Sequence, residues 1–363
     1  MANDSLDKAR KEINEIDKEM AELFVRRMHA AEAVAQYKKE RGLAILDEAR
    51  EYEVIKRNSS FVENETIREY YVNFLQNTMA VSRAYQSRLV EGMRVAFSGT
   101  EGAFAHIAAC KLYPTAKKIS YGDFSEAYRS VEHGECDVAV LPVENSYNGE
   151  VGQVTDLMFS GSLYVNGMFD LPVTQDLLAK DGVRIEDIKE VVSHPQAFGQ
   201  CRSYIERHGF TRHEFANTAL AARWVAESPD RSIAAIGSRE AAEIFGLKVI
   251  DHDINESKSN STRFAIFSRT ANKRIAKDGG VHSILLFTVR NEAGALAKAV
   301  DVIGRYGFNM RTLRSRPMKE LLWEYYFYVE VEGNVQSEAG ASLLESLGEF
   351  CDRLKFAGTY IKL

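Results

Sequence analysis

The sequence predicts a multidomain protein with three successive fold classes. These are an all-α N-terminal domain, a two-lobed α/β middle domain with a parallel sheet, and a ferredoxin-like α+β C-terminal domain. Three observations predict this order. Gly42 is the only glycine before Gly92, and no proline occurs before Pro114, which favours long helices. Short apolar runs ending in polar loops then alternate with helical stretches. From residue 281 onward the pattern is βαββαβ.

A chain of 363 residues is too long for one ordinary core, and we expect domains over residues 1–91, 92–270 and 281–363. The net charge of −6 argues against nucleic acid as a partner. No apolar run is long enough for a membrane span, and the polar N-terminus lacks the apolar core of a signal peptide, so a cytoplasmic location is expected. The four cysteines form no CxxC pair or Cys/His cluster, and we expect no metal, cofactor or disulfide.

The N-terminal region predicts three helices, over residues 5–39, 47–58 and 65–90. In the first, apolar residues recur at helical spacing, among them Ile13, Ile16, Met20 and Leu23. A bundle whose first helix is this long and only partly buried often completes its core by dimerising. We therefore expect a homodimer or a higher homo-oligomer.

Polar residues on these helices indicate a binding site for a small dicarboxylate. Arg27 and Lys38 are 11 positions apart, so they share a helix face and lie roughly 16 Å apart along it. Arg10 is turned from Arg27 by about 100°, so it points out of that site and is available to a partner subunit instead. Buried charge needs a partner, and a bound dianion supplies one. The other polar positions on shared faces are Asp47, Arg50, Glu51, Ser82 and Gln86.

The middle region places polar loops at the ends of apolar strands, where α/β sheets bind ligands. The strand-like runs are residues 93–99, 137–146, 190–198 and 232–238. The loops read GTEGAFAH from Gly99, PVENS from Pro142, SHPQAF from Ser193 and STRF from Ser261. Asn217-Thr218 either caps a helix or contacts a ligand. Residues 270–280 read as a linker.

The C-terminal region predicts four strands and two helices. The strands are expected over residues 282–289, 309–317, 323–333 and 354–363, and the helices over 294–307 and 337–350. Asn309 either binds a ligand or is a turn residue after Gly307.

The N-terminal constellation of Arg10, Arg27, Lys38, Asp47, Arg50, Glu51, Ser82 and Gln86 resembles the all-helical chorismate mutases position by position. The resemblance implies chorismate as substrate and prephenate as product. A Claisen rearrangement needs a folded substrate and stabilised charge on the breaking ether oxygen, without proton transfer. Arginines would hold the carboxylates, Lys38 and Gln86 would donate to the ether oxygen, and Glu51 and Asp47 would take the ring hydroxyl. In that family Arg10 enters the other subunit's site.

The four loops of the middle region resemble prephenate dehydratase, whose GxxGxFxH, PxENS, SHPQ and TRF motifs appear here in the family's order. The implied reaction is decarboxylation of prephenate with loss of the ring hydroxyl. Thr262 is implied to assist that hydroxyl, as an oriented donor or through a neighbour, for which Glu144 is the expected candidate. Substrate binding is implied for Asn145, Ser146, Ser193, Gln196, Thr218, Arg263 and Phe264. His106 and His194 are expected to be structural.

The C-terminal region resembles the ACT domain, an amino-acid-sensing module. In the version fused to prephenate dehydratase, GALV and ESRP motifs bind phenylalanine. The implied effector site comprises Gly294, Ala295, Leu296, Asn309, Ser315, Arg316 and Pro317. The second motif reads RSRP here, with Arg314 in place of the acid, so retention of feedback inhibition stays open.

The resemblance covers nearly the whole chain and implies a bifunctional enzyme of phenylalanine biosynthesis. Three alternatives stay open. In the first, only one catalytic domain is active. In the second, arogenate replaces prephenate as the dehydratase substrate. In the third, the two-lobed domain is a non-enzymatic solute binder.

Overall fold

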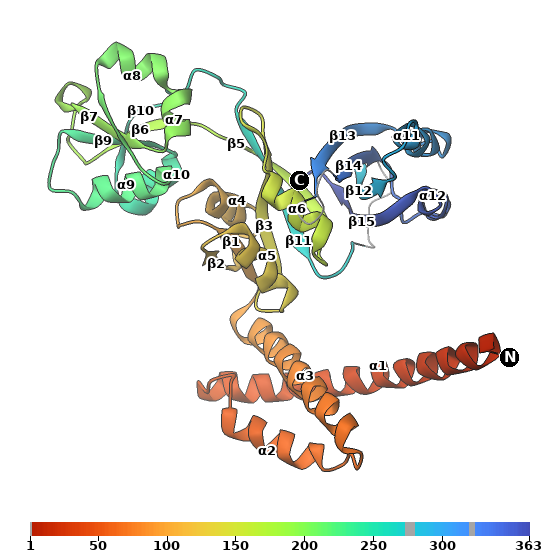
Figure 1. Cartoon of the computed structure of the whole chain (residues 1–363). Helices are drawn as coiled ribbons and strands as arrows, with labels where there is room; N and C mark the ends of the chain where they lie inside the picture. Colours follow the sequence, from red (N-terminus) through yellow and green to blue (C-terminus); the bar gives the residue numbers. More distant parts are fainter. Residues whose placement is uncertain (1, 273–279, 319–323) are drawn as a thin grey trace. The chain divides into compact units, whose positions relative to one another are not determined.

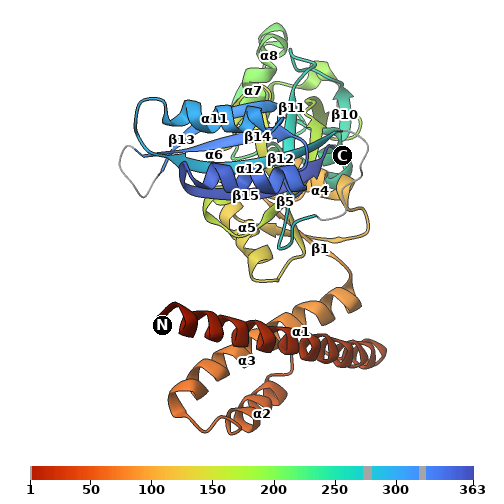
Figure 2. The same cartoon turned by 90° about the vertical axis from the view of Figure 1, so that its right-hand side faces the viewer.

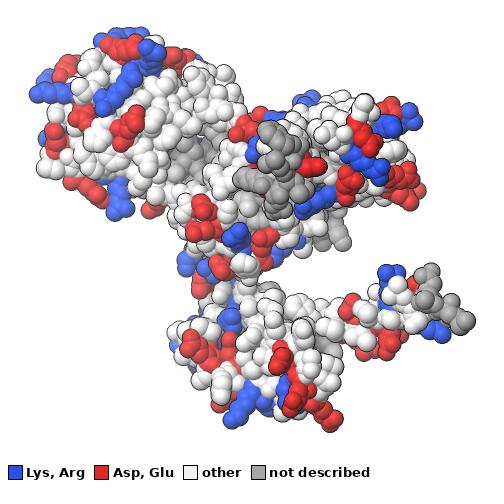
Figure 3. All heavy atoms as spheres, viewed as in Figure 1, with Lys and Arg blue, Asp and Glu red and all other residues white. Residues whose placement is uncertain are grey.

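The computed structural model describes residues 2–272, 280–318 and 324–363, so most of the predicted linker lies outside the described residues. The chain divides into two compact units, Met1–Arg94 and Val95–Leu363 (Figure 1). Over the described part of the chain, no helix has the length and apolar character needed to cross a membrane. Acidic and basic side chains are interspersed on the face seen in Figure 3.

The first unit consists of three helices close to the predicted ranges: α1 (Ala2–Arg41), α2 (Glu48–Ser59) and α3 (Glu65–Glu91). Side chains of Asp47 and Asn64 cap α2 and α3 by accepting backbone N–H groups. Ala31 and Ala35 of α1 are buried, as are Leu75 and Met79 of α3. The N-terminal half of α1 extends beyond the other helices, and its apolar side chains are exposed (Figure 1).

In the second unit, the first lobe is built on a sheet of strand order β2-β1-β3-β11-β5, with β4 paired to β3. Strand β11 returns from the second lobe and inserts between β3 and β5, antiparallel to both. The sheet is therefore mixed, whereas the alternating sequence pattern predicts a parallel one. Its elements are β1 (Arg94–Ser98), β2 (Lys117–Tyr121), β3 (Val138–Asn145), β4 (Gly149–Glu150), β5 (Tyr164–Pro172), β11 (Ser261–Ser268), α4 (Phe104–Leu112), α5 (Phe124–Glu132) and α6 (Gly152–Ser160).

The second lobe has a five-stranded sheet of order β10-β6-β9-β7-β8, which is also mixed. Helices cover both faces, because alternate strand residues enter two separate apolar clusters: Leu177 and Val191 lie in one, Leu178 and Val192 in the other. The elements are β6 (Asp176–Ala179), η1 (Ile185–Asp187), β7 (Glu190–Ser193), α7 (Pro195–Gln200), α8 (Arg202–His208), β8 (Thr211–Glu214), α9 (Thr218–Glu227), β9 (Ile233–Gly237), α10 (Arg239–Phe245) and β10 (Lys248–Asp251).

The C-terminal module has the predicted βαββαβ order and an antiparallel sheet β13-β14-β12-β15. Helices α11 and α12 lie side by side over one face of this sheet (Figure 2). The other face joins the core of the first lobe, with Ile284, Tyr326 and Tyr360 among the shared buried residues. The elements are β12 (Val281–Val289), α11 (Ala295–Arg305), β13 (Met310–Pro317), β14 (Tyr325–Glu332), α12 (Glu338–Gly348) and β15 (Cys351–Ile361).

Candidate active sites

The helical unit brings several of the predicted polar residues toward α3 and the α1–α2 connection. The Lys38 ammonium is half-buried and donates to the Ile45 carbonyl at 2.5 Å. Arg27 Nη1 reaches the Thr78 carbonyl of α3 at 3.5 Å. Ser82 and Gln86 are buried on α3, with Gln86 Nε2 3.4 Å from Ser82 Oγ. Among the described residues, Gln86 Oε1 has no hydrogen-bond partner, so a polar group faces this region unsatisfied.

The acidic members of the constellation are held within the same unit. Asp47 Oδ1 accepts the Arg50 backbone N–H at 3.0 Å, and the Arg50 guanidinium lies 3.2 Å from Glu53. Glu51 pairs with Arg83 of α3, a cation that the sequence reasoning did not select. Arg83 directly follows Ser82, a predicted site residue, and this position could have indicated Arg83 in the sequence.

Arg10 stands apart from the others within one chain. It lies 28 positions before Lys38 on the same helix, which corresponds to about 42 Å along the axis. Its side chain is exposed and lies 4.0 Å from the Asp7 carboxylate. Arg10 therefore has no access to the other cations of its own chain.

In the second unit, a pocket of about 480 Å³ lies between the two lobes. It combines the carboxyl end of β3 and the start of β11 with the N-terminal ends of α7 and α9. Five of the predicted site residues line it: Asn145, Gln196, Thr218, Thr262 and Phe264. Its other polar lining residues are Asn148, Glu150, Gln175, His194, Gln200 and Asn217.

Asn145 organises the wall of this pocket. Its Nδ2 donates to Thr262 Oγ1 at 2.9 Å, to Asn260 Oδ1 at 2.9 Å and to the Ser261 carbonyl at 3.2 Å. Its Oδ1 accepts the backbone N–H groups of Tyr147 and Asn148, which fixes the turn after β3. Because Thr262 Oγ1 already accepts from Asn145, its own O–H is directed elsewhere as a donor. The geometry thus produces an oriented hydroxyl donor on the pocket wall.

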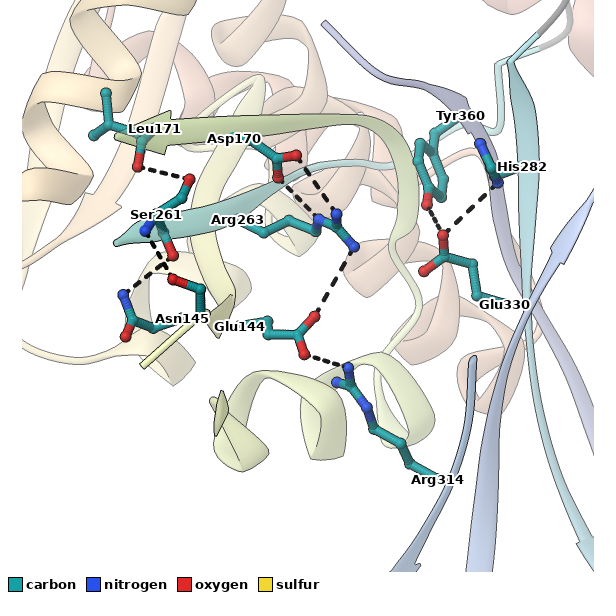
Figure 4. A network of polar contacts seen from close by, with 11 residues as sticks. Glu144, Asn145, Asp170, Leu171, Ser261, Arg263, His282, Arg314, Glu330 and Tyr360 are labelled. Atoms are coloured by element: carbon teal, nitrogen blue, oxygen red, sulfur yellow. Dashed lines mark hydrogen bonds and ion pairs between the residues drawn. The ribbon is translucent and has the colours of Figure 1, made fainter. Parts of the chain in front are cut away.

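Glu144 does not stand beside Thr262, contrary to the sequence expectation. Thr262 pairs with Asn145 across β11 and β3, and Arg263 pairs with Glu144. Since successive strand residues point to opposite faces, Glu144 and Arg263 face away from the pocket. Figure 4 shows Glu144 between Arg263, at 3.9 Å, and Arg314 of the C-terminal module. Arg263 Nε also lies 2.9 Å from Asp170 Oδ1. Neither Glu144 nor Arg263 lines the pocket.

Two further predicted residues hold the backbone near the pocket without lining it. Ser193 is fully buried and its hydroxyl donates to the Ile236 carbonyl at 2.6 Å. Ser146 Oγ donates to the Ser259 carbonyl at 3.1 Å and accepts the Ser261 N–H at 2.9 Å. Both serines therefore join loops or strands that are distant in sequence.

The two histidines have structural contacts. His106 Nδ1 accepts the Gly102 N–H at 3.2 Å, and burial lowers the pKa of His106 below its usual value, which keeps the ring neutral. His194 lines the pocket and caps α7 through Gln196 N, at 3.2 Å. Asn217 caps α9 by accepting the Leu220 N–H, so the helix-capping alternative for this residue is confirmed.

Sequence reasoning missed Gln175 and Gln200, two buried residues of the pocket. Gln175 Nε2 donates to Gln200 Oε1 at 3.1 Å, and Gln175 is 2% exposed. Gln175 Oε1 has no hydrogen-bond partner within the described ranges. Gln175 stands in the polar triplet Thr174-Gln175-Asp176 at the start of β6, which gave no distinct signal in the sequence. An unsatisfied buried acceptor in a pocket favours a ligand that donates a hydrogen bond.

In the C-terminal module, Gly294 is the N-cap of α11 with φ +83°, a conformation that favours glycine, and Ala295 and Leu296 follow in the first turn. Asn309 Nδ2 donates to Glu332 at 2.9 Å. Along β13, Ser315 and Pro317 are exposed. Arg316 lies instead on the inward face, where its guanidinium pairs with Glu150 and Asp156 of the first lobe.

Over the described part of the chain, no cluster of three or more histidine, cysteine, aspartate or glutamate side chains is suited to a metal ion. The polar groups of the pocket are mainly amides and hydroxyls. Such groups orient a ligand and donate hydrogen bonds to developing charge.

Three family models match the chain in succession. Residues 9–87 match chorismate mutase type II, residues 95–272 match prephenate dehydratase, and residues 283–349 match the ACT domain. Two solved structures share the fold of the second unit, each with a TM-score of 0.68 and covering 74% of this chain. One is a prephenate dehydratase in complex with L-Phe from Arthrobacter aurescens, at 27% identity over 90% of that chain. The other is GqqA, described as a quorum quenching acylase, at 29% identity over 98% of that chain.

Two relatives extend the comparison. Arogenate dehydratase/prephenate dehydratase 2 of Arabidopsis thaliana is 33% identical over 74% of this chain and 72% of its own length. A bifunctional chorismate mutase/prephenate dehydratase of Neisseria gonorrhoeae is 31% identical and covers 97% of this chain and 95% of its own length. With all three family models matched in the same order, the chain belongs to the family of bifunctional chorismate mutase/prephenate dehydratases.

Proposed function

We propose that this protein converts chorismate to prephenate in the helical unit and prephenate to phenylpyruvate in the pocket of the second unit. The observation that carries the second half is the Thr262 hydroxyl, held as a donor by Asn145 on the pocket wall. We further propose that the chain is organised as a mutase domain over 1–91, a dehydratase domain over 92–270 and a regulatory ACT domain over 281–363.

The mutase reaction needs positioning and charge stabilisation only, and the helical unit offers the side chains for both. Arg27, with Arg50 on the neighbouring helix, would hold the two carboxylates of chorismate in the folded conformation. Lys38 and Gln86 would donate to the ether oxygen as its bond breaks. Asp47, Glu51 and Ser82 would contact the remaining polar groups of the substrate.

A homodimer would complete this site. Arg10 lies about 42 Å along α1 from Lys38, so it can serve only a site on another chain. The exposed apolar side chains of the same half of α1 support pairing with a second copy. They are Leu6, Ile13, Ile16 and Met20. Sedimentation over a dilution series tests this, and a monomer with full mutase activity would contradict it.

The dehydratase reaction breaks two bonds of prephenate. The ring carboxylate leaves as CO₂, its electron pair enters the ring, and the hydroxyl departs from the opposite carbon as the ring becomes aromatic. Thr262 would donate a hydrogen bond to the departing oxygen, which stabilises its developing negative charge. Asn145, Gln196, Thr218 and Phe264 would position the substrate. Arg263, Glu144, Ser146 and Ser193 would act indirectly, by holding the strands and loops that bear these residues.

We also propose that phenylalanine regulates the enzyme through the ACT domain, at the segment from Gly294 to Leu296 and at Asn309, Ser315 and Pro317. A cytoplasmic location fits this role. Support comes from the matched ACT model and from the similar dehydratase structure that contains L-Phe.

A paired assay tests the function as a whole. The purified chain is given chorismate, prephenate or arogenate, each with and without phenylalanine. We expect turnover of chorismate and prephenate. Conversion of arogenate instead of prephenate would reassign the dehydratase substrate, and no conversion of either would contradict the dehydratase proposal.

A further inference from the structure

Strand β13 of the C-terminal module directs two arginines toward the first lobe. Side chains along β13 alternate between half-buried and exposed, which places Arg314 and Arg316 on one face and Ser315 on the other. Arg314 and Arg316 are only 29% and 21% exposed. Both guanidinium groups therefore lie at the contact between the module and the lobe.

Their partners are two glutamates that face each other across the β3–β4 hairpin, residues 138–150. Glu144 of β3 pairs with Glu150 of β4 in the sheet register. Arg314 forms an ion pair with Glu144, and Arg316 Nη1 lies 3.3 Å from Glu150 Oε2. Arg316 Nε also lies 3.0 Å from Asp156 Oδ1 in the middle of the lobe's helix α6. One strand of the module thus holds both strands of the hairpin.

The same hairpin forms a wall of the dehydratase pocket. Asn145, Asn148, Gly149 and Glu150 line the pocket, and Asn145 orients Thr262. Glu144 is the residue before Asn145, and its other contact is Arg263, the residue after Thr262 (Figure 4). The ion pairs therefore fix Glu144 and Arg263 on one face of the sheet. Their neighbours, Asn145 and Thr262, form the hydrogen-bonded pair on the pocket face.

A positive charge at position 314 suits the contact with Glu144. The motif that this segment resembles has glutamate at the first position, as in ESRP. A glutamate here would face Glu144 with like charge, and the two carboxylates would repel. Arg314, which replaces the glutamate of the motif, thus has a charge opposite to that of Glu144.

We propose that Arg314 and Arg316 are positioning residues of the dehydratase site, which hold the β3–β4 hairpin so that Asn145 presents Thr262 to the substrate. Ser315, between them on the opposite face of β13, links this contact to the proposed effector site. This inference rests on the proposed dehydratase function of the pocket.

A double-mutant cycle of Arg314→Gln, Glu144→Gln and the double variant tests it. If Glu144 acts through Arg314, each single change lowers kcat/KM for prephenate about fivefold or more, and the double variant is no worse than either single one. Arg314→Lys keeps the positive charge and an N–H donor group, and we expect it to retain most of the rate. If Glu144 takes part in the chemistry directly, the two losses multiply, which overturns the proposal.

Arg311→Gln is the matched control, because Arg311 lies on the same strand but pairs with Glu332 inside the module, at 3.1 Å. It should leave the dehydratase rate unchanged. A urea titration of every variant reports whether the second unit is folded, and the mutase rate reports that the helical unit is intact. Hydrogen exchange of the amides from 145 to 151 should become faster in Arg314→Gln and stay unchanged in Arg311→Gln.

Unchanged exchange and unchanged kcat/KM in Arg314→Gln would also overturn the proposal. If the wild-type chain converts no prephenate, the proposed function fails by itself. The exchange measurement then still decides whether Arg314 holds the hairpin.

Discussion

Replacing Thr262 by valine removes the hydroxyl donor of the pocket while keeping the side-chain shape. The wild-type Thr262 Oγ1 accepts from Asn145 Nδ2 at 2.9 Å, which leaves the threonine proton free for the substrate. Valine has no proton to donate and offers no acceptor. The departing hydroxyl of prephenate would then lose one oriented hydrogen bond in the transition state.

The structure allows the effects on rate and stability to be separated. Loss of one preorganised donor to developing negative charge typically lowers kcat by about 10²–10³-fold. Asn145 Nδ2 keeps two other acceptors in the variant, Asn260 Oδ1 at 2.9 Å and the Ser261 carbonyl at 3.2 Å. The free energy of unfolding should therefore fall by no more than about 1.5 kcal/mol, the net value of one hydrogen bond.

The assay compares formation of phenylpyruvate from prephenate with consumption of chorismate in the same preparation. Thr262→Val should lose dehydratase kcat and keep its mutase rate, whereas Thr262→Ser, which retains the hydroxyl, should keep most of both. A Thr262→Val enzyme whose dehydratase kcat stays within about threefold of wild type would refute the assignment of Thr262 as the donor.

Three further predictions concern other parts of the chain. Lys38→Ala should lower mutase kcat by about 10²-fold or more and leave the dehydratase rate intact, and a loss of both rates in a folded chain would contradict the two-site arrangement. Tyr128→Phe should lower the free energy of unfolding by about 1–3 kcal/mol in a urea titration, because the buried Leu163 N–H loses the phenol oxygen at 2.9 Å; an unchanged midpoint would refute this. Burial lowers the pKa of His106, so the unfolded chain binds a proton at this residue more readily than the folded chain. The stability that His106 contributes is present above its ordinary pKa of about 6.5. That stability is lost as the pH falls through the lower pKa of the folded state. His106→Phe should remove this part of the pH dependence of unfolding, which denaturation at neutral and acidic pH measures.

Local sequence patterns predicted the elements and their order because those patterns are direct consequences of backbone periodicity. The three N-terminal helices begin and end within three residues of the predicted ranges. Polar loops after apolar strands led to Asn145, Gln196 and Thr262, which the pocket brings together. Strand ends meet at a sheet edge whatever the detailed register, so this inference needed no long-range information.

The direction of a side chain could not be predicted in the same way. Glu144 and Asn145 are adjacent, yet only Asn145 faces the pocket. Which of the two does so depends on the pairing of β3 with β11, more than a hundred residues later in the chain, and that register shifts between Arg263 and Phe264. Sequence patterns contain no information on such a register. Gln175 escaped attention for a related reason, since its environment depends on Gln200 of a different element.

The core that the C-terminal sheet shares with the first lobe bears on regulation. The helical unit has its own small core, and its apolar surface on α1 is left exposed. The C-terminal sheet instead contributes Tyr326, Tyr328 and Tyr360 to the core of the first lobe. A Cβ atom on Gly358 would lie within 2.2 Å of the Val165 carbonyl oxygen, so the two backbones are in close contact. A packed core tolerates little displacement, and a shift of the sheet must therefore move the lobe with it. Packing and ion pairs thus join the C-terminal module directly to the lobe that bears the pocket.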